Sequence, residues 1–150
     1  MEDLSPEAII KFLDMQPLPV EGGMLAQTWI DEHSSGIYYL LQRPQTSGLH
    51  RLRHVEIFQY HGGAPARMLL LHEDGRISEP VLGLSLAQGQ RPQVVVPPRT
   101  WQATETLGQW SLLGTYMSPP YNDNEIEFGK AEALIPLYPS ASARIRRLER

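Results

Sequence analysis

The chain has 150 residues, a size typical of one domain that buries roughly 68–70% of its unfolded surface. Its net charge of −4, without a long basic run, argues against a nucleic-acid partner, and the lack of cysteine excludes disulfides, thiolate catalysis and sulfur-ligated zinc. The 13 prolines and 12 glycines are too many for a helix bundle and predict many short elements and turns.

Residues 4–15 predict a short amphipathic helix. Ser5 is a candidate N-cap, Pro6 takes the first helical position and Glu7 lies in the first turn. Apolar residues follow at helical spacing until Pro17 ends the pattern. The sequence carries neither a secretory signal nor 18 consecutive apolar residues, so we expect a cytoplasmic protein that does not enter a membrane.

From Met24 onward the sequence predicts strands. The candidates are short, rich in β-branched and aromatic residues and mostly separated by Pro or Gly, and they cover 24–30, 37–42, 54–61, 67–72, 76–78, 80–84, 93–96, 102–105 and 110–117. Such regular spacing predicts a mainly β fold, either a sandwich or a barrel. Ser140 is a candidate cap for a final short helix through Ile145 and Leu148, whose mixed charges predict a solvated face. We expect a single domain over residues 1–150.

Four stretches together resemble one known family. They cover residues 19–23, 50–58, 89–97 and 101–103. In this order they resemble the cupin-5 family, also called DUF985, over nearly the whole chain. The resemblance implies an all-β double-stranded β-helix, or jelly-roll barrel, with a short helix at each end. It also implies a homodimer and a relation to cupins such as sugar-nucleotide epimerases, but no settled activity.

The chain departs from the family's pattern where ligands would be held. Relatives tend to carry an Asp before the glutamate and a His three residues after it, whereas this chain has Val55 and Gln59 there. The later strand carries Gln102 in place of a histidine. His50 and Glu56 remain in the positions that the resemblance assigns to the site.

One hypothesis is a metal-dependent enzyme. Side chains an even number of residues apart share a strand face, so a regular strand from 50 to 56 would point His50, His54 and Glu56 into the barrel. This set would suit a divalent transition metal. Gln102 is a poor ligand for such a metal, and a break near Arg53 would turn His50 away from the other two residues. In the ordinary interpretation, His50 forms a hydrogen bond with a ligand or a neighbour and His54 lies on a surface loop.

Another hypothesis needs no metal. In related cupin epimerases a barrel histidine removes a proton beside a carbonyl and a tyrosine returns one from the opposite face. A histidine pKa of roughly 6.5 suits a base near neutral pH, which makes His50 the candidate. Tyr60 is a candidate acid, with Tyr38 and Tyr116 as alternatives, although most buried tyrosines are ordinary core residues. Whether the chain is an enzyme stays open on the residues alone.

The remaining candidates describe a ligand pocket. Arg51 and Arg99 offer guanidinium forks for a carboxylate or phosphate. Phe58, Trp101 and Gln102 would form an apolar wall with one amide to orient a guest. Each set also has an ordinary interpretation, as surface ion pairs or a dimer contact for the arginines and as core packing for the others.

The sequence therefore favours a dimeric barrel that binds a small sugar-like or anionic molecule. The residues expected to line its site are His50, Arg51, Glu56, Trp101 and Gln102. The alternatives are the metal-dependent enzyme and a barrel that serves only as a structural or interaction module. Exposed strand edges make dimerisation by edge pairing physically sensible in every case.

Overall fold

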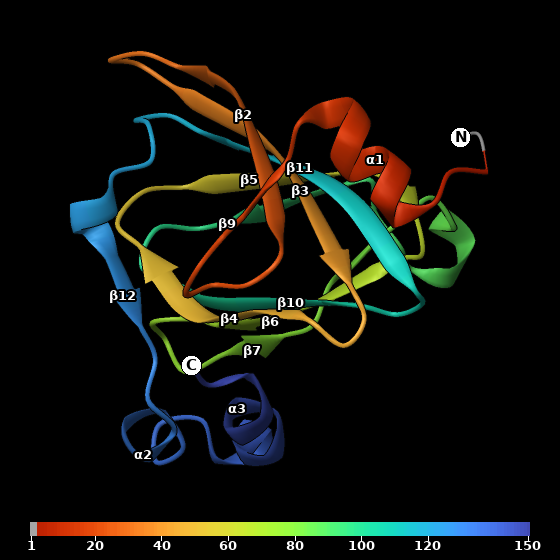
Figure 1. The fold of residues 1–150 in the computed structure, drawn as a ribbon. Coiled ribbons are helices and arrows are strands. Elements are labelled where there is room, and N and C mark those ends of the chain that lie inside the picture. Colours follow the sequence, from red (N-terminus) through yellow and green to blue (C-terminus); the bar gives the residue numbers. More distant parts are fainter. Residues whose placement is uncertain (1–2) are drawn as a thin grey trace.

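A computed structural model describes residues 3–150 and shows a mainly β fold with two antiparallel sheets facing each other (Figure 1). We call them sheet A and sheet B. Sheet A has the order β1 (Gln16–Pro17), β2 (Met24–Ile30), β3 (Ser35–Gln42), β11 (Trp110–Met117), β5 (Glu56–Gly63) and β9 (Gln93–Val96). Sheet B has the order β12 (Ile126–Phe128), β4 (Thr46–Leu52), β10 (Trp101–Thr106), β6 (Ala66–Leu71) and β7 (Ile77–Ser78), with β8 (Val81–Leu82) also paired to β6. This is the jelly-roll barrel that the resemblance implies.

The space between the sheets holds the main core. Because side chains alternate along a strand, every second residue points inward, and the buried ones include Leu41, Phe58, Met68 and Leu113. Burying one such side chain contributes about 1.5–3 kcal/mol. The apolar core fills only part of the barrel, and polar side chains occupy the rest.

Helix α1 (Pro6–Leu13) covers part of the outer face of sheet A. The Ser5 hydroxyl accepts a hydrogen bond from the backbone N–H of Ala8 at 3.1 Å, which confirms the predicted N-cap. The helix ends at Asp14 in the left-handed conformation, and its buried residue Ile9 packs against sheet residues Leu40 and Leu112.

The helices α2 (Ala131–Leu134) and α3 (Ser142–Leu148) cover the outer face of sheet B, as Figure 1 shows. Ile145 and Leu148 of α3 are fully buried against Leu49, Leu69 and other apolar residues of that face. The predicted cap Ser140 instead lies within the 3-10 turn Pro139–Ala141, and no side chain caps α3.

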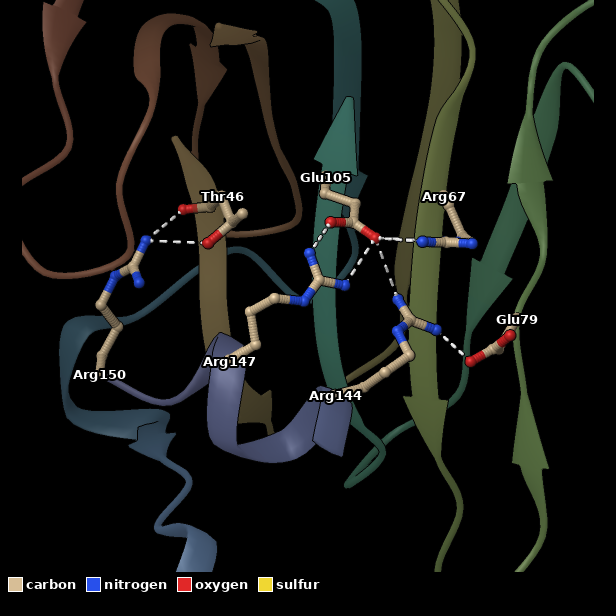
Figure 2. A network of polar contacts seen from close by, with 7 residues as sticks. All are labelled: Thr46, Arg67, Glu79, Glu105, Arg144, Arg147 and Arg150. Carbon is tan, nitrogen blue, oxygen red and sulfur yellow. Dashed lines mark hydrogen bonds and ion pairs between the residues drawn. The ribbon is translucent and has the colours of Figure 1, made fainter. Parts of the chain in front are cut away.

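The charged side of α3 is held by a buried carboxylate, which corrects the prediction of a solvated face. Figure 2 shows Arg144 and Arg147 of α3 converging with Arg67 of β6 on Glu105 of β10. The closest nitrogen–oxygen distances to Glu105 are 2.7 Å for Arg67, 3.4 Å for Arg144 and 2.6 Å for Arg147. Arg144 also pairs with Glu79.

The strand predictions agree closely with sheet A and less closely with sheet B. The ranges 24–30, 93–96 and 110–117 match β2, β9 and β11 residue for residue. The regular strand from 50 to 56, on which the metal hypothesis depended, does not form, because β4 ends at Leu52 and β5 begins at Glu56. The alternative break near Arg53 is present, but it takes His54 rather than His50 away from the barrel. The strand β4 and the short elements β1, β12 and α2 have no counterpart among the predicted elements. No helix within residues 3–150 is long and apolar enough to cross a membrane.

Candidate functional site

A cavity of about 700 Å³ opens between the two sheets. Its exposed lining residues include Gln27 and Ile30 near the end of β2, and Asn122 to Asn124 in the segment that leads into β12. These exposed residues mark the mouth. The deeper lining includes Glu21, Ile37, His50, Glu56, Thr115 and Tyr121. We refer to this space as the barrel cavity.

An irregularity in β4 brings polar side chains to the inner face. Gln102 of β10 lies opposite His50, but Thr104 lies opposite Ser47, so three steps along β4 match two along β10. An extra residue of this kind turns the following side chains to the other face. Ser47 and His50 therefore both face the interior, although their odd spacing in a regular strand would put them on opposite faces.

The imidazole of His50 has a defined tautomer. Its Nδ1 lies 2.7 Å from the carbonyl oxygen of Gly48, and because a carbonyl only accepts, Nδ1 carries the proton and donates it. Burial lowers the pKa of His50, while the Gly48 carbonyl and Glu56 act in the opposite direction. The ring is therefore neutral at pH 7, and Nε2 is left as a basic nitrogen.

Glu21 faces that basic nitrogen. Its Oε2 lies 3.8 Å from Nε2 of His50. Glu21 precedes Gly22, whose φ of 91° requires glycine and whose carbonyl accepts a hydrogen bond from the Tyr39 hydroxyl at 2.5 Å. Burial, and secondarily the charge of Asp123, raise the pKa of Glu21 to about 7. Glu21 can therefore hold or release a proton near neutral pH.

Glu56 is the second buried carboxyl of the cavity. Its Oε1 accepts a hydrogen bond from Nε2 of Gln102 at 3.0 Å, across the barrel from β10 to β5. Burial raises the pKa of Glu56, although His50 and the bonds from Thr115 and Gln102 oppose the rise. Gln102 therefore holds the Glu56 carboxyl in place, and its own carbonyl oxygen, Oε1, stays unpaired among the described residues.

The titratable groups that line the barrel cavity are mostly carboxyl groups, and two of them have raised pKa values, which reduces the negative charge of the lining. Three carboxyl groups and one imidazole line the cavity, and its lining residues include neither lysine nor arginine. Two of the carboxyls, Glu21 and Glu56, have raised pKa values because no cation compensates their burial. Such a surface suits a neutral guest with hydroxyl and carbonyl groups better than an anion.

The structure separates the three side chains of the metal hypothesis. His50 and Glu56 line the barrel cavity, but His54 lies in the turn between β4 and β5 and pairs with Glu125 at 3.3 Å. Residues 3–150 contain no group of three or more His, Asp or Glu side chains placed to hold a metal ion. The chain's own residues do not fit a transition-metal centre of the proposed kind, because one imidazole of the set points elsewhere.

Two predicted pocket residues lie outside the barrel. Trp101 faces outward because it alternates with the inward residue Gln102, and it packs against the cluster under α2 and α3. Arg51 alternates with His50, and its guanidinium lies 4.4 Å from the centre of the Trp101 ring. Arg51 also pairs with Glu127 at 3.0 Å. Neither residue lines the barrel cavity.

The predicted acid Tyr60 and the predicted wall residue Phe58 do not meet at one site in the barrel cavity. The Tyr60 hydroxyl donates to the carbonyl of Gly63 at 2.6 Å and lines no part of the cavity, because Tyr60 lies further along β5 than Glu56. Tyr38 and Tyr116 likewise do not line it. Phe58 lies in the main core and touches the deepest extension of the cavity.

A second hollow, the arginine groove, lies beside the cavity. Its volume is about 330 Å³, and its lining residues are Arg51, Leu52, Arg53, Arg99, Asn124, Glu125 and Glu127. Leu52 and Asn124 line both hollows, so the groove and the cavity share a wall. The predicted ligand residues Arg51 and Arg99 belong to this groove.

Sequence reasoning missed Glu21 and Tyr121 as site residues. Glu21 was assigned to a turn, and Tyr121 follows two prolines in a segment without strand pattern. Two available signals pointed to Glu21: it lies in the stretch 19–23 that takes part in the family resemblance, and it precedes two glycines that allow close approach of backbone and ligand.

Comparisons with known proteins agree with this fold. A family described as "Cupin superfamily (DUF985)" matches residues 7–129. A crystal structure of a protein from Shewanella oneidensis superimposes with a TM-score of 0.90 at 30% identity, covering 98% of each chain. A hypothetical protein from Leishmania major gives a TM-score of 0.87 at 24% identity, covering 97% of this chain and 99% of that one.

More distant structures share the fold alone. Oxalate decarboxylase from Bacillus subtilis gives a TM-score of 0.62 at 14% identity, covering 90% of this chain and 37% of that one. That enzyme holds Mn(II) centres. No curated protein matches the chain.

Proposed function

The chain belongs to the DUF985 family of the cupin superfamily, and on that premise we propose that its barrel cavity binds a small, neutral, polyhydroxylated molecule such as a sugar. The observation that carries the proposal is the barrel cavity itself, about 700 Å³ in volume with His50, Glu21 and Glu56 deep inside. Ligand pockets of small molecules typically have volumes of roughly 300–1,000 Å³ and a few convergent polar groups.

The apolar part of the lining suits the body of such a molecule. Leu18, Leu25, Ile37, Leu52 and Met117 surround the polar groups. Protonated Glu21 donates a hydrogen bond, and Nε2 of His50 and the carboxyl oxygens of Glu56 accept, so a molecule with several hydroxyl groups finds both donors and acceptors. A free anion would meet carboxyl groups without a compensating cation.

A second candidate function is an isomerase-like proton transfer. Its support is the pair formed by the basic Nε2 of His50 and the Glu21 carboxyl at 3.8 Å, since Glu21 can hold or release a proton near neutral pH. His50 would take a proton from the carbon next to a carbonyl while protonated Glu21 gives its proton to the carbonyl oxygen, which forms an enediol. Return of the proton from His50 to the former carbonyl carbon, and of a hydroxyl proton to Glu21, would complete the isomerisation and restore both groups. Epimerisation would need an acid on the opposite face, and Tyr60 lies outside the cavity.

A thermal-shift screen tests the binding proposal. Neutral sugars, sugar acids and sugar phosphates would be added to the wild-type protein and to an Ile37→Trp variant, in which the larger side chain fills the cavity. We expect stabilisation by sugar ligands in the wild type and its loss in the variant. The matched control is Val95→Trp, since Val95 is 50% exposed on the outside of the same barrel layer.

Two results would contradict the proposal. One is a shift of equal size in the wild type and in Ile37→Trp, which would place the ligand elsewhere. The other is no shift with any member of the panel. For the proton-transfer function, the His50→Gln variant should bind the sugar and fail to exchange its proton with deuterated water; retained exchange would remove His50 as the base.

We further infer that two copies associate through the open part of the outer face of sheet A. Cross-strand neighbours form a row over Trp29, Gly36, Tyr116, Ile57 and Val95. Trp29, Tyr116 and Val95 are 57%, 46% and 50% exposed, although two are aromatic and one is β-branched. An exposed apolar face of this kind favours burial against a partner, and a second copy offers a matching face around a two-fold axis.

Light scattering behind size-exclusion chromatography tests the dimer. The wild type should elute with twice the chain mass, and a Trp29→Glu/Tyr116→Glu variant should elute as a monomer with unchanged circular dichroism. Leu137→Glu is the control, because Leu137 is 66% exposed away from this face. A wild-type monomer at all concentrations would refute the dimer.

A further inference from the structure

We propose that the arginine groove binds a phosphoryl group and that the ligand of the barrel cavity is therefore a phosphorylated sugar, an inference that rests on the proposed function. The sugar would occupy the cavity, and its phosphate would lie outside the barrel between Arg53 and Arg99. The shared wall of Leu52 and Asn124 makes the two hollows neighbours that one small molecule can span.

The charges of the groove leave two arginines available. Glu127 is held by Arg51 through two hydrogen bonds of 3.2 and 3.0 Å. Glu125 is held by His54 at 3.3 Å. Arg53 and Arg99 also line the groove, yet neither forms an ion pair within the described part of the chain. Glu125 and Glu127 thus already have partners within the chain, and the guanidinium groups of Arg53 and Arg99 can bind an added anion.

The backbone at Arg99 gives independent support. Its φ is 59°, in the left-handed region that side chains other than glycine, asparagine and aspartate rarely adopt. The backbone N–H of Arg99 donates to the carbonyl of Leu52 at 2.8 Å, which holds this conformation against the end of β4. A strained residue persists where the surrounding structure fixes it, and such positions concentrate at binding sites. Here the unusual backbone conformation sets the position from which the Arg99 side chain extends into the groove.

The chemistry of the two hollows is complementary. Guanidinium groups bind phosphate through paired N–H donors with matching geometry. The barrel cavity provides no cation for such a group, so a phosphate enters the groove while an uncharged sugar body enters the cavity. The division assigns each part of the ligand to the hollow that matches its charge.

The first experiment uses inorganic phosphate as the probe. In two-dimensional NMR, phosphate should shift the backbone and side-chain resonances of Arg53 and Arg99, with a Kd on the order of 1–10 mM. An Arg53→Gln/Arg99→Gln variant should weaken binding about tenfold or more, since both charged donors are lost. Arg146→Gln is the control, because Arg146 is exposed on α3, on a different surface. Unchanged binding by the double variant, or phosphate shifts confined to other residues, would overturn the proposal.

The second experiment tests the link to the cavity. Each sugar phosphate of a pentose and hexose panel would be compared with its unphosphorylated sugar and with inorganic phosphate. We expect one sugar phosphate to bind at least about tenfold more tightly than both, which is about 1.4 kcal/mol. Ile37→Trp should remove that gain and leave phosphate binding intact.

The outcomes separate the two proposals. Phosphate binding in the groove without any gain for a sugar phosphate would overturn the spanning ligand. If sugars alone bind in a way that Ile37→Trp abolishes, while phosphate misses Arg53 and Arg99, the cavity function would stand and the groove proposal would fail. If the wild-type protein binds no sugar of the panel but phosphate still binds at Arg53 and Arg99, the proposed function of the cavity would fail.

Discussion

Glu105 and Glu56 lie on opposite faces of the barrel wall, and each is only 8% exposed, although Glu56 lies deeper in the protein. On the outer face, hydrogen bonds from Arg147, opposed by burial and joined by Arg67, lower the pKa of Glu105 to about 2. On the inner face, burial raises the pKa of Glu56 because no cation faces it. The depth of burial and the partners that the chain supplies together set the pKa of each carboxyl group.

The difference separates a structural carboxylate from a functional one. The Glu105 cluster joins α3 to β10 and β6, and all its partners come from the chain (Figure 2). Glu56 and Glu21 have partial partners, so their remaining hydrogen-bonding capacity faces the barrel cavity. Such incompletely satisfied groups are the ones that a ligand can complete.

The largest expected effect is the loss of the outer cluster. Glu105→Gln should lower the free energy of unfolding by about 3 kcal/mol at pH 7, because guanidinium groups are left crowded without their anion. The folded pKa of about 2 lies below the ordinary 4.5, so the stabilisation is present above pH 4.5 and is lost as the pH falls toward 2. Urea unfolding between pH 3 and pH 7 measures both effects.

The matched control for the outer cluster is Glu127→Gln. Glu127 also pairs with an arginine, but its side chain is 60% exposed. We expect a change below about 0.5 kcal/mol, since exposed ion pairs contribute little. Equal effects of the two substitutions would show that burial of Glu105 is irrelevant to its contribution.

The inner face should respond with the opposite sign. Glu21→Gln should raise the free energy of unfolding by about 2 kcal/mol above pH 7, because ionising a buried carboxyl opposes folding. The folded pKa of about 7 lies above the ordinary 4.5, so protonation of Glu21 favours the folded state. This contribution to the free energy of unfolding is fully present below pH 4.5 and is lost as the pH rises through 7.

Unfolding curves at pH 5 and pH 8 check this inner-face prediction. The gain from Glu21→Gln should be small at pH 5 and near its maximum at pH 8. Glu32→Gln is the control, because the Glu32 side chain is 85% exposed and should show a flat difference. A destabilised Glu21→Gln protein at pH 8 would show that Glu21 is ionised in a favourable environment.

The smallest expected effect concerns Arg51 on the outer face. Arg51→Ala removes both the contact with the Trp101 ring and the pair with Glu127, and we expect a loss of about 1 kcal/mol. Arg53→Ala, two residues further along the chain in the same groove, should change stability by less than about 0.5 kcal/mol. A loss at Arg51 as large as that at Glu105 would contradict the ranking of buried over exposed pairs.

Local patterns were sufficient to predict most strands and the first helix. Ser5 and Pro6 specify a helix start, because the Ser5 hydroxyl accepts a backbone N–H of the first turn and Pro6 fits the first helical position, and β11 is set off by Gly108 before it and Pro119 after it. The break at 53–55 was weighed only as an alternative to a regular strand, because residues 53–55 include neither glycine nor proline to mark it. The cap at Ser140 failed because α3 is fixed by packing of Ile145 and by arginine pairs rather than by a capping side chain.

The site was predicted only in part, because the sequence does not show which distant segments meet in the folded chain. His50 and Glu56 reach the cavity as the resemblance implied, and Gln102 lies beside Glu56. Glu21 could not be paired with His50 in advance, because the two meet only when the segment before β2 folds across the barrel. The roles of His50, Tyr60 and the arginines in binding or catalysis stay predictions.

The alternation along β10 has an evolutionary consequence. Trp101, Ala103 and Glu105 serve the face that holds α3, whereas Gln102 and Thr104 serve the interior. Substitutions at the interior positions can thus alter what the barrel accepts while the attachment of α3 is inherited unchanged. Insertion or deletion of one residue would exchange the two sets at once, so the interior positions of β10 can vary in composition, whereas the length of the strand cannot.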